Sequence, residues 1–304
     1  MFFRPKLGLV LGGGGARGGA HVGVVRVLSE VGYKPDIIVG TSSGGVVAVM
    51  LGAGWSPDQV ERYFSQADFS KLLYLVREGN SLMGNERLRT ELERLFGNAD
   101  LRDLSPKVAV MAADIRNSQR ILIERGPIVE AVLASAALPG LLPPIPWGEC
   151  LLADGGITDN VPVQAAYQLG AQRVVAVDLG ANSETGFEVD EGHGFSKYLQ
   201  GTLHWLLGLG RRQTAFDIFV HSQLLSSEML VDYHLALFPP DVLIRPNMPG
   251  IGLFSFEKIP VAIRAGEQAA QQVYPQLRAL AHSLLLPRKP RKPPTLQIAM
   301  PPDF

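Results

Sequence analysis

The sequence holds only one cysteine, Cys150, among its 304 residues. A single thiol excludes an intrachain disulfide and a zinc site built from cysteine pairs, and it is typical of a reducing compartment. Charge of one sign is also missing, because 28 basic residues are balanced by 29 acidic ones and the formal net charge is −1. That balance lacks the basic footprint of a nucleic-acid-binding protein. We therefore expect no nucleic-acid partner.

Signals for export and membrane insertion are weak. The first residues, MFFRPKLGLVLGGGG, lack a charged segment followed by a clean apolar stretch and a small-residue cleavage site, so we expect no signal peptide. The uncharged run Ile37–Trp55 is long enough to resemble a membrane span. Glycines and a Thr-Ser-Ser cluster interrupt it, which favours a buried strand, a tight turn and a buried helix. These features predict a cytoplasmic protein, at most peripheral at the membrane.

Apolar residues are plentiful at 46%, with 19% charged residues, which is enough to bury the core of one large domain. We expect residues 1–286 to form that domain. Residues 287–304 begin with a basic, proline-rich stretch and predict an extended tail. A solvated tail is favoured over contact of its basic residues with an anionic membrane. The polar, glycine-containing segment Asn182–Gly194 predicts a surface loop.

Short apolar runs alternate with segments of helical periodicity along the chain. This rhythm predicts an α/β fold with a mainly parallel sheet that is covered on both faces. The predicted strands are Lys6–Leu11, Asp36–Val39, Val108–Ala112, Arg120–Ile123, Leu151–Ala153, Arg173–Val177 and Val242–Ile244. The predicted helices are Arg17–Val31, Gly44–Leu51, Pro57–Ala67, Asn85–Phe96, Pro127–Ser135, Pro162–Leu169 and Ile259–Leu285.

A glycine-rich loop, Gly12–Gly19, follows the first predicted strand and leads into a helix. Glycines permit positive φ angles and allow backbone N–H groups to converge on an anion. The helix N-terminus contributes partial positive charge, and Arg17 contributes a full charge nearby. The loop is therefore suited to holding negative charge, although it does not identify the anion.

Four interpretations of this loop compete. A Walker phosphate loop would end in Gly-Lys-Ser/Thr, which is absent. The dinucleotide pattern G-x-G-x-x-G matches Gly13, Gly15 and Gly18, but its acidic partner should end the second strand. Asp36 instead begins that strand. An oxyanion hole and a plain tight turn remain open at this point.

A nucleophile elbow, G-x-S-x-G, is formed by Gly40, Thr41, Ser42, Ser43 and Gly44. It lies between a predicted apolar strand and a predicted apolar helix, the context in which a sharp turn exposes a serine at the end of a sheet. Ser42 is the expected nucleophile, and Ser43 is expected to face the helix side. Together with the anion-holding loop, the elbow predicts an acyl-transfer site.

A serine hydroxyl needs a proton acceptor. Asp154, followed by Gly155 and Gly156, ends a short apolar strand, where the active sites of open α/β sheets gather. The Asp-Gly pair is also typical of an ordinary turn. Asp178 and Asp159 are alternative bases.

Histidines do not stand in a recognisable signature. His21 follows the glycine loop, where packing or capping is the favoured role. A triad of Ser42, Asp154 and His193 stays open as an alternative to a histidine-free pair.

Three motifs occur in order: GGGGARG, GTSSG and DGG, with ASAALPGLLPP before the last and DNVPVQAAYQLGA after it. From about Lys6 to Ala270, the sequence resembles the patatin-like phospholipases. The resemblance implies a three-layer α/β/α sandwich and a dyad of Ser42 and Asp154 that uses no histidine. It also implies an oxyanion loop made by Gly13, Gly14, Gly15, Ala16, Arg17 and Gly18.

The same resemblance implies a carboxylic ester hydrolase of the phospholipase A or lysophospholipase type, with a lipid substrate, transient membrane-surface contact and neither metal nor organic cofactor. Ser43 departs from many relatives, which carry alanine there. We hypothesise that Ala134–Trp147 gives the site an apolar wall, which would raise the basicity of Asp154. Phe195–Leu237 predicts either core helices or a lipid-facing lid. The rival hypothesis is a non-catalytic nucleotide- or lipid-binding protein.

Overall fold

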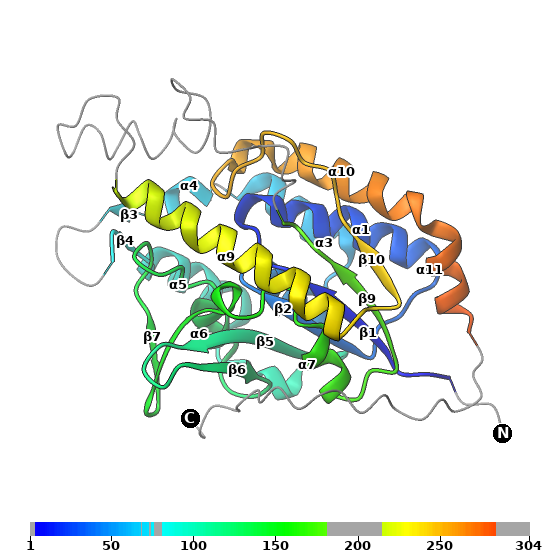
Figure 1. Cartoon of the computed structure of the whole chain (residues 1–304), viewed down its shortest axis with the longest axis horizontal. Helices are drawn as coiled ribbons and strands as arrows, with labels where there is room; N and C mark the ends of the chain where they lie inside the picture. Colours follow the sequence, from blue (N-terminus) through cyan, green and yellow to red (C-terminus); the bar gives the residue numbers. More distant parts are fainter. Residues whose placement is uncertain (1–3, 68, 73, 76–80, 181–214, 284–304) are drawn as a thin grey trace.

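The computed structural model describes residues 4–67, 69–72, 74–75, 81–180 and 215–283. Its centre is an eight-stranded sheet in the order β10-β9-β1-β2-β5-β8-β7, with β6 paired to β5 (Figure 1). The strands are β1 (Leu7–Leu11), β2 (Ile37–Thr41), β5 (Lys107–Asp114), β6 (Gln119–Ile123), β7 (Ile145–Trp147), β8 (Cys150–Asp154), β9 (Arg173–Val177) and β10 (Val242–Ile244). A separate short pair consists of β3 (Tyr74–Leu75) and β4 (Met83–Gly84).

The sheet is mainly parallel, as expected from the alternation of strands and helices. The strands from β10 to β5 run parallel, whereas β6 and β8 pair antiparallel with β5 and β7 pairs antiparallel with β8. All seven strands predicted from sequence are present with small shifts at their ends. The prediction missed β7, because its three residues include a proline and show no alternation, and it also missed the two-residue strands β3 and β4.

Helices cover both faces of the sheet, which confirms the three-layer α/β/α prediction (Figure 1). One layer contains α1 (Gly19–Glu30), α2 (Ser43–Gly52), α3 (Pro57–Gln66), α5 (Glu86–Phe96), α6 (Ile128–Ser135), α10 (Ile259–Gln272) and α11 (Tyr274–Ala281), with the short α4 (Phe69–Leu72) beside it. The other layer contains α7 (Val163–Gln168) and α9 (Ala215–Leu237). Single 3-10 turns are η1 (Gly15–Gly18), η2 (Leu101–Asp103), η3 (Gly155–Ile157) and η4 (Phe256–Lys258).

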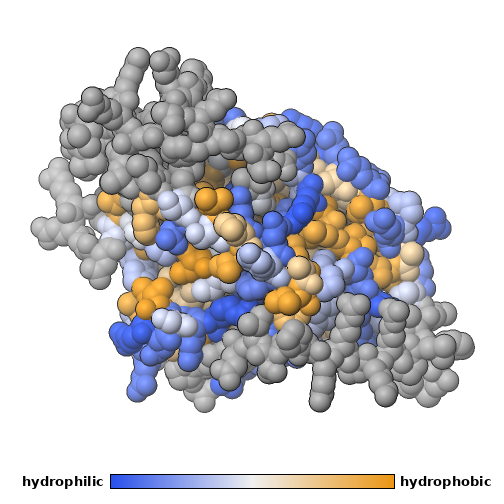
Figure 2. Space-filling view, viewed as in Figure 1, coloured by the Kyte–Doolittle hydropathy of each residue, from blue (hydrophilic) through white to orange (hydrophobic). Residues whose placement is uncertain are grey.

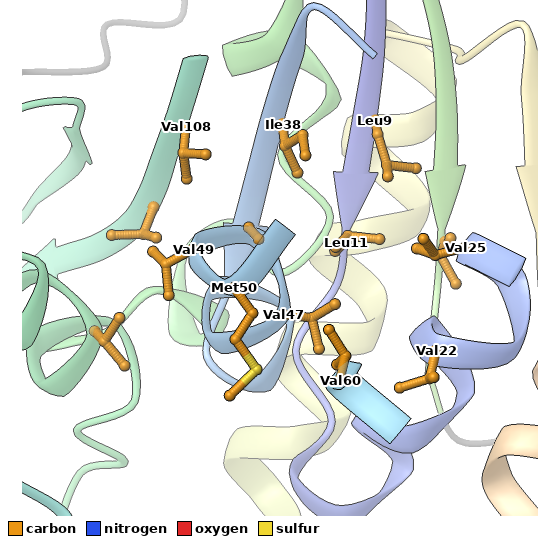
Figure 3. Packing of buried hydrophobic residues seen from close by; sticks show 14 of the residues in the cluster. Leu9, Leu11, Val22, Val25, Ile38, Val47, Val49, Met50, Val60 and Val108 are labelled. Atoms are coloured by element: carbon orange, nitrogen blue, oxygen red, sulfur yellow. The ribbon is translucent and has the colours of Figure 1, made fainter. Parts of the chain in front are cut away.

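Alternating side chains along each strand divide the core into two clusters. Leu9 and Leu11 of β1 pack against the α1 and α2 layer (Figure 3), whereas Val10 packs with α7 and α9. All three are at most 1% exposed. Because both faces are buried, the strands are continuously apolar rather than alternating in polarity. This burial holds the ends of β1 and β2, which precede the two candidate site loops, in fixed positions.

One long helix was expected over Ile259–Leu285, and this prediction is wrong. The structure has two helices, α10 ending at Gln272 and α11 beginning at Tyr274. Pro275 lies in the first turn of α11, where its missing N–H costs nothing; inside a continuous helix it would remove a hydrogen bond. The apolar periodicity continues across the break, which is why it did not reveal the interruption.

The run Ile37–Trp55 forms β2, the elbow and α2, as interpreted from its glycines. Within the described ranges, every helix is too short or too polar to cross a bilayer. The loop predicted at Asn182–Gly194, the tail 287–304 and His193 lie outside the described residues. Of Phe195–Leu237, only α9 is described. It buries Val220, Val231 and Leu235 against the fold, and other apolar side chains of this helix are exposed.

Candidate active site

The nucleophile elbow has the strained backbone that its motif predicts. Ser42 connects β2 to α2 with φ 52° and ψ −121°, and its N–H donates to Ser135 Oγ at 2.9 Å. A non-glycine residue at positive φ persists only when its surroundings hold it there. A Cβ on Gly40 would overlap the Gly44 carbonyl, and a Cβ on Gly44 would overlap the Leu11 carbonyl. The turn therefore requires both flanking glycines, and it presents Ser42 at the end of the sheet.

Sheet register brings Asp154 level with Ser42. Thr41 in β2 is registered with Met111 in β5, and the next residue, Ala112, pairs with Asp154 in β8. Ser42 and Asp154 thus flank β5 at the same level. Asp154 lies at a strand end, as predicted, in a sheet that was predicted to be mainly parallel. Because β8 is antiparallel to β5, its C-terminal end would ordinarily lie at the other edge of the sheet. Asp154 lies level with Ser42 because it pairs with Ala112 of β5.

The Asp154 carboxylate is buried, at 5% exposure, and accepts the Gly156 N–H at 2.7 Å. Burial raises its pKa to about 6, while the hydrogen bond from Gly156 and the nearby Ser42 hydroxyl act in the opposite direction. The Asp154 N–H donates to the Ala137 carbonyl at 2.9 Å, so the backbone of the Ala134–Trp147 segment contacts the base residue. The hydroxyl and the carboxylate therefore meet in a desolvated site.

The two alternative bases each have a cationic partner. Asp178 accepts Arg245 Nε at 2.8 Å, and Asp159 accepts Arg120 at 3.1 Å. No cationic side chain within the described residues pairs with Asp154. An ion pair stabilises the carboxylate and makes it a poorer base, whereas an unpaired buried carboxylate is a better one. The geometry therefore favours Asp154 over both alternatives.

The glycine-rich loop lies directly against the nucleophile. A Cβ on Gly13 would stand 3.1 Å from Ser42 Cβ. The Gly13 N–H donates to Asn160 Oδ1 at 3.1 Å, and Asn160 Nδ2 returns a bond to the Gly13 carbonyl at 3.2 Å. The Gly14 N–H donates to Ser43 Oγ at 3.1 Å. Ser43 was expected to face the helix side, and this expectation is wrong because its hydroxyl faces the glycine loop.

Some of the other backbone N–H groups of the predicted oxyanion loop already donate hydrogen bonds within the protein, and others do not. Ala16 N–H donates to the Leu253 carbonyl at 2.7 Å, and Arg17 N–H donates to the Gly14 carbonyl at 3.1 Å. Gly18 closes the 3-10 turn η1 and leads into α1. The Gly15 N–H has no acceptor among the described residues. Within the described part of the chain the Gly15 amide has no partner, whereas the Gly13 and Gly14 amides donate to Asn160 Oδ1 and Ser43 Oγ.

Arg17 lies behind this loop. Its side chain is 9% exposed, and burial lowers the pKa of the guanidinium, an effect opposed by nearby Glu228 and Asp178. Arg17 Nε donates to the Gly14 carbonyl at 3.5 Å, so this side chain contacts the loop backbone.

His21 has the packing role that its position predicted. It is fully buried, and its Nε2 donates to the Gly12 carbonyl at 2.7 Å. Burial lowers its pKa to about 4, so the ring is neutral near pH 7. Neither His21 nor any other histidine with a described side chain shares a hydrogen bond with Asp154.

The dinucleotide hypothesis fails on the position of Asp36. The carboxylate accepts the Leu7 N–H at 2.8 Å and pairs with Arg4, at the start of β1 and β2. The glycine loop lies at the opposite end of these strands. Asp36 therefore cannot meet a ribose held by this loop, as the dinucleotide fold requires.

Two contributors to the site were not singled out from the sequence. Ser135 holds the Ser42 amide, and Asn160 holds Gly13. Both stand within the strings that carried the family resemblance, ASAALPG and DNVPV, so a signal was present. Their roles were invisible because each acts on a backbone group that is distant in sequence.

Comparison with known proteins agrees with this architecture. Residues 9–167, just over half of the chain, match the patatin-like phospholipase family. The chain therefore belongs to that family. The crystal structure of VipD from Legionella pneumophila superposes with a TM-score of 0.57 at 15% identity, covering 90% of this chain and 67% of that one. At this identity the likeness concerns the fold alone.

Curated relatives include a Candida albicans protein named lysophospholipase NTE1, which is 37% identical over 183 residues. This match covers 58% of the present chain and 13% of the relative. An uncharacterised NTE family protein of Mycobacterium bovis is 30% identical over 282 residues, covering 88% of this chain and 46% of the relative. The chain thus spans less than half the length of these relatives.

Proposed function

We propose that this protein is a serine acyl hydrolase that cleaves fatty-acyl esters of lysophospholipids, phospholipids or related lipids. The observation that carries the proposal is the placing of Ser42 and Asp154 at the same level on either side of β5, with the serine on a strained elbow and the carboxylate buried without a cation among the described residues. A weakly solvated carboxylate accepts a proton more readily than an exposed one. The pair therefore supplies both a nucleophile and its base.

In the first half of the reaction, Ser42 Oγ attacks the acyl carbonyl carbon and its proton passes to the Asp154 carboxylate. The carbonyl oxygen becomes negative and is stabilised by glycine-loop amides, foremost that of Gly15. The bond to the alcohol then breaks. The leaving alkoxide takes the proton from Asp154, and the acyl group stays on Ser42.

In the second half, a water molecule attacks the acyl carbon as Asp154 accepts one of its protons. The same amides stabilise the second tetrahedral intermediate. Its collapse breaks the bond to Ser42 Oγ, which regains the proton, and the fatty acid leaves. Asp154 alternates between base and acid in both halves, so the pair needs no histidine.

A lipid substrate is supported by the surroundings of the pair and by the relatives. The backbone of the apolar Ala134–Trp147 segment bonds to Asp154, and one relative is named a lysophospholipase. Figure 2 shows apolar side chains exposed on the face that α9 crosses, and those of α9 include Phe219, Leu225, Met229, Leu230, Tyr233 and Leu237. They offer a surface for transient membrane contact.

A fluorophosphonate probe tests the nucleophile, because it reacts only with an activated serine. We expect stoichiometric labelling of the wild-type chain, and of the surface variant Ser226→Ala as a matched control. Ser42→Ala should lose labelling and hydrolysis of a lysophospholipid panel by about a thousandfold or more. Dinucleotide binding without labelling would instead support the non-catalytic binding hypothesis.

Single histidine variants distinguish the dyad from a triad. We expect each variant to keep hydrolysis within about 100-fold of wild type, since none replaces the proton acceptor. A loss in one of them as large as that of Asp154→Asn would contradict the dyad. His193, His204 and His221 belong in this set because their side chains are not described.

A further inference from the structure

The segment that follows Asp154, residues 155–160, contacts every part of the candidate site. The Gly156 N–H donates to Asp154 Oδ1, and Asn160 exchanges hydrogen bonds with Gly13. The Asp159 carbonyl accepts the Thr41 hydroxyl at 3.2 Å, immediately before the nucleophile. We call residues 155–160 the base loop. A displacement of this loop would move the base, the nucleophile strand and the glycine loop together.

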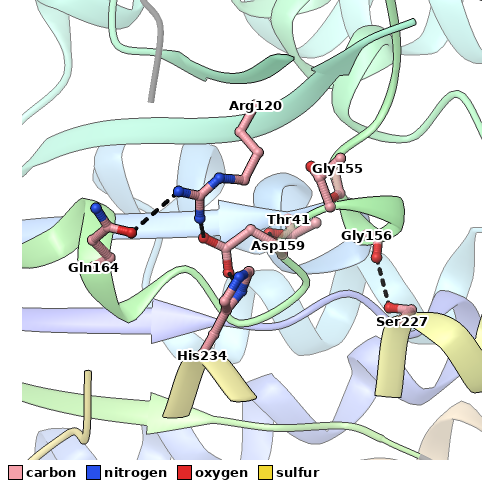
Figure 4. A network of polar contacts seen from close by, with 9 residues as sticks. Thr41, Arg120, Gly155, Gly156, Asp159, Gln164, Ser227 and His234 are labelled. Carbon is pink, nitrogen blue, oxygen red and sulfur yellow. Dashed lines mark hydrogen bonds and ion pairs between the residues drawn. The ribbon is translucent and has the colours of Figure 1, made fainter. Parts of the chain in front are cut away.

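Two side chains of α9, Ser227 and His234, form hydrogen bonds with the base loop (Figure 4). Ser227 Oγ donates to the Gly156 carbonyl at 2.6 Å. His234 Nδ1 lies 3.2 Å from Asp159 Oδ1. Since an ionised carboxylate only accepts hydrogen bonds, Nδ1 carries the proton. Ser227 and His234 are two helical turns apart and therefore share one face of α9.

The Asp159 carboxylate, which contacts His234, is buried and held by a second hydrogen bond. Asp159 is 2% exposed, and its second oxygen accepts Arg120 at 3.1 Å. Arg120 also donates a hydrogen bond to Gln164 Oε1 at 3.3 Å (Figure 4). Buried charge-assisted hydrogen bonds hold their partners more firmly than exposed ones. His234 is thus tied to the sheet through a carboxylate that has little freedom to move.

We propose that α9 is the positioning element of the active site, with His234 and Ser227 holding the base loop in its working geometry. Neither residue touches the reacting atoms, so each acts through Gly156 or Asp159. This inference rests on the proposed hydrolase function. It assigns a role to a helix that sequence analysis considered only as core or lid.

The test compares kcat and KM for hydrolysis of a p-nitrophenyl acyl ester by the full chain. His234→Leu should lower kcat by about 10- to 100-fold, the cost of a small misplacement of catalytic groups, with KM changed less than about threefold. His234→Asn should restore most of kcat, because the asparagine amide N–H can replace Nδ1–H. Ser227→Ala should lower kcat by about three- to tenfold.

Matched controls separate positioning from general damage. Ser226→Ala removes the neighbouring hydroxyl, whose partner is only the Ser222 carbonyl, and His282→Leu makes the same change at an exposed histidine. Both should keep wild-type kcat. If Ser227→Ala and His234→Leu match these controls, or if only KM changes, or if His234→Asn is as impaired as His234→Leu, the proposal is overturned.

Amide hydrogen exchange gives a second readout that does not depend on catalysis. Exchange of the Gly156 and Gly13 amides should accelerate in Ser227→Ala and His234→Leu but not in the two controls. If the wild-type chain neither hydrolyses esters nor reacts with the fluorophosphonate, the proposed function fails. Exchange then still decides whether α9 anchors the base loop, and unchanged protection overturns that anchoring.

Discussion

Asp154 differs from Asp159 and Asp178, the two alternative bases, because no arginine pairs with its carboxylate among the described residues. Asp159 and Asp178 each accept from an arginine, whereas Asp154 accepts from the Gly156 backbone amide. Burial raises its pKa to about 6, which brings the group closer to neutrality than an ordinary aspartate. A base with that pKa is still ionised at pH 7 and is stronger than an exposed carboxylate.

The pH dependence of the reaction follows from this pKa. In the proposed mechanism only ionised Asp154 can accept the serine proton, so kcat/KM should rise with pH, reach half of its plateau near pH 6 and stay level above it. One pH unit below the pKa, the rate should be about a tenth of the plateau. Steady-state assays with a substrate that does not titrate in this range measure the profile. A midpoint near pH 4 would show that Asp154 is solvated or is not the base.

In the proposed mechanism, Ser43 limits the number of glycine-loop amides that are free to stabilise an oxyanion. Its hydroxyl accepts the Gly14 N–H in the resting site, so a substrate oxygen must compete with it. We expect Ser43→Ala to raise kcat by about two- to tenfold, the worth of one hydrogen bond. The rate of a p-nitrophenyl ester measures the effect, with Ser226→Ala as the control. A lower kcat in Ser43→Ala would show that the hydroxyl itself donates to the oxyanion.

At the scale of single residues, motif spacing predicted Ser42 and Asp154, because the elbow and the Asp-Gly-Gly turn are local backbone events. Spacing did not predict the partners of Ser43, Ser135 and Asn160. Their hydroxyl and amide groups are bonded to backbone atoms whose neighbourhood depends on the whole sheet.

At the scale of elements, helices α1 and α10 pack more closely than ordinary helices. A Cβ on Gly266 would overlap the Ala20 carbonyl oxygen, and a Cβ on Gly23 would overlap the Ile263 carbonyl oxygen. Each helix therefore presents a glycine to the other backbone. Glycine costs helix stability, so its presence here reflects the contact and not the helix itself.

Gly266→Ala should destabilise the fold by at least about 2 kcal/mol, because neither backbone can move away without disturbing the core. Urea unfolding measures the change. Gly252→Ala is the matched control, since its Cβ would stand 3.5 Å from Ser255 Oγ in an ordinary contact. It should stay within about 1 kcal/mol of wild type. Equal stability of the two variants would contradict the close packing of α1 and α10.

The direction of β8 could not be predicted from its sequence. An apolar strand of five residues fits a parallel or an antiparallel place equally well, and the choice depends on the short hairpin with β7. The break between α10 and α11 was missed for a related reason. Periodicity reports which side chains are buried, whereas the continuity of a helix depends on backbone hydrogen bonds.

At the scale of the whole molecule, two buried groups have opposite effects on how the free energy of unfolding changes with pH. Asp154 has a folded pKa of about 6 against an ordinary 3.8, so its contribution to stability is lost as pH rises through 6. His21 has a folded pKa of about 4 against an ordinary 6.5, so its contribution is lost as pH falls through 4. Between about pH 4 and 6 the two effects cancel.

Replacing either Asp154 or His21 should therefore reveal the pH dependence of stability that the remaining group causes. Relative to wild type, Asp154→Asn should gain up to about 3 kcal/mol of unfolding free energy as pH rises from about 4 to 7. His21→Gln should gain a similar amount, relative to wild type, as pH falls over the same range. Urea unfolding across this range measures both differences. Two differences of the same sign would contradict the opposed burial of these groups.

Local sequence decided the elements of this protein and the residue types of its chemistry. Apolar runs, glycines at sharp turns and the order of three motifs depend on neighbours along the chain, and these predicted the α/β fold, the elbow and the Asp-Gly-Gly turn. Tertiary structure alone decided which groups meet. Strand register places Asp154 at the same level as Ser42. Burial and packing bring Ser43 into hydrogen bonding with Gly14, and α9 into hydrogen bonding with the base loop. Those properties depend on residues far apart in the chain, so no local pattern encodes them.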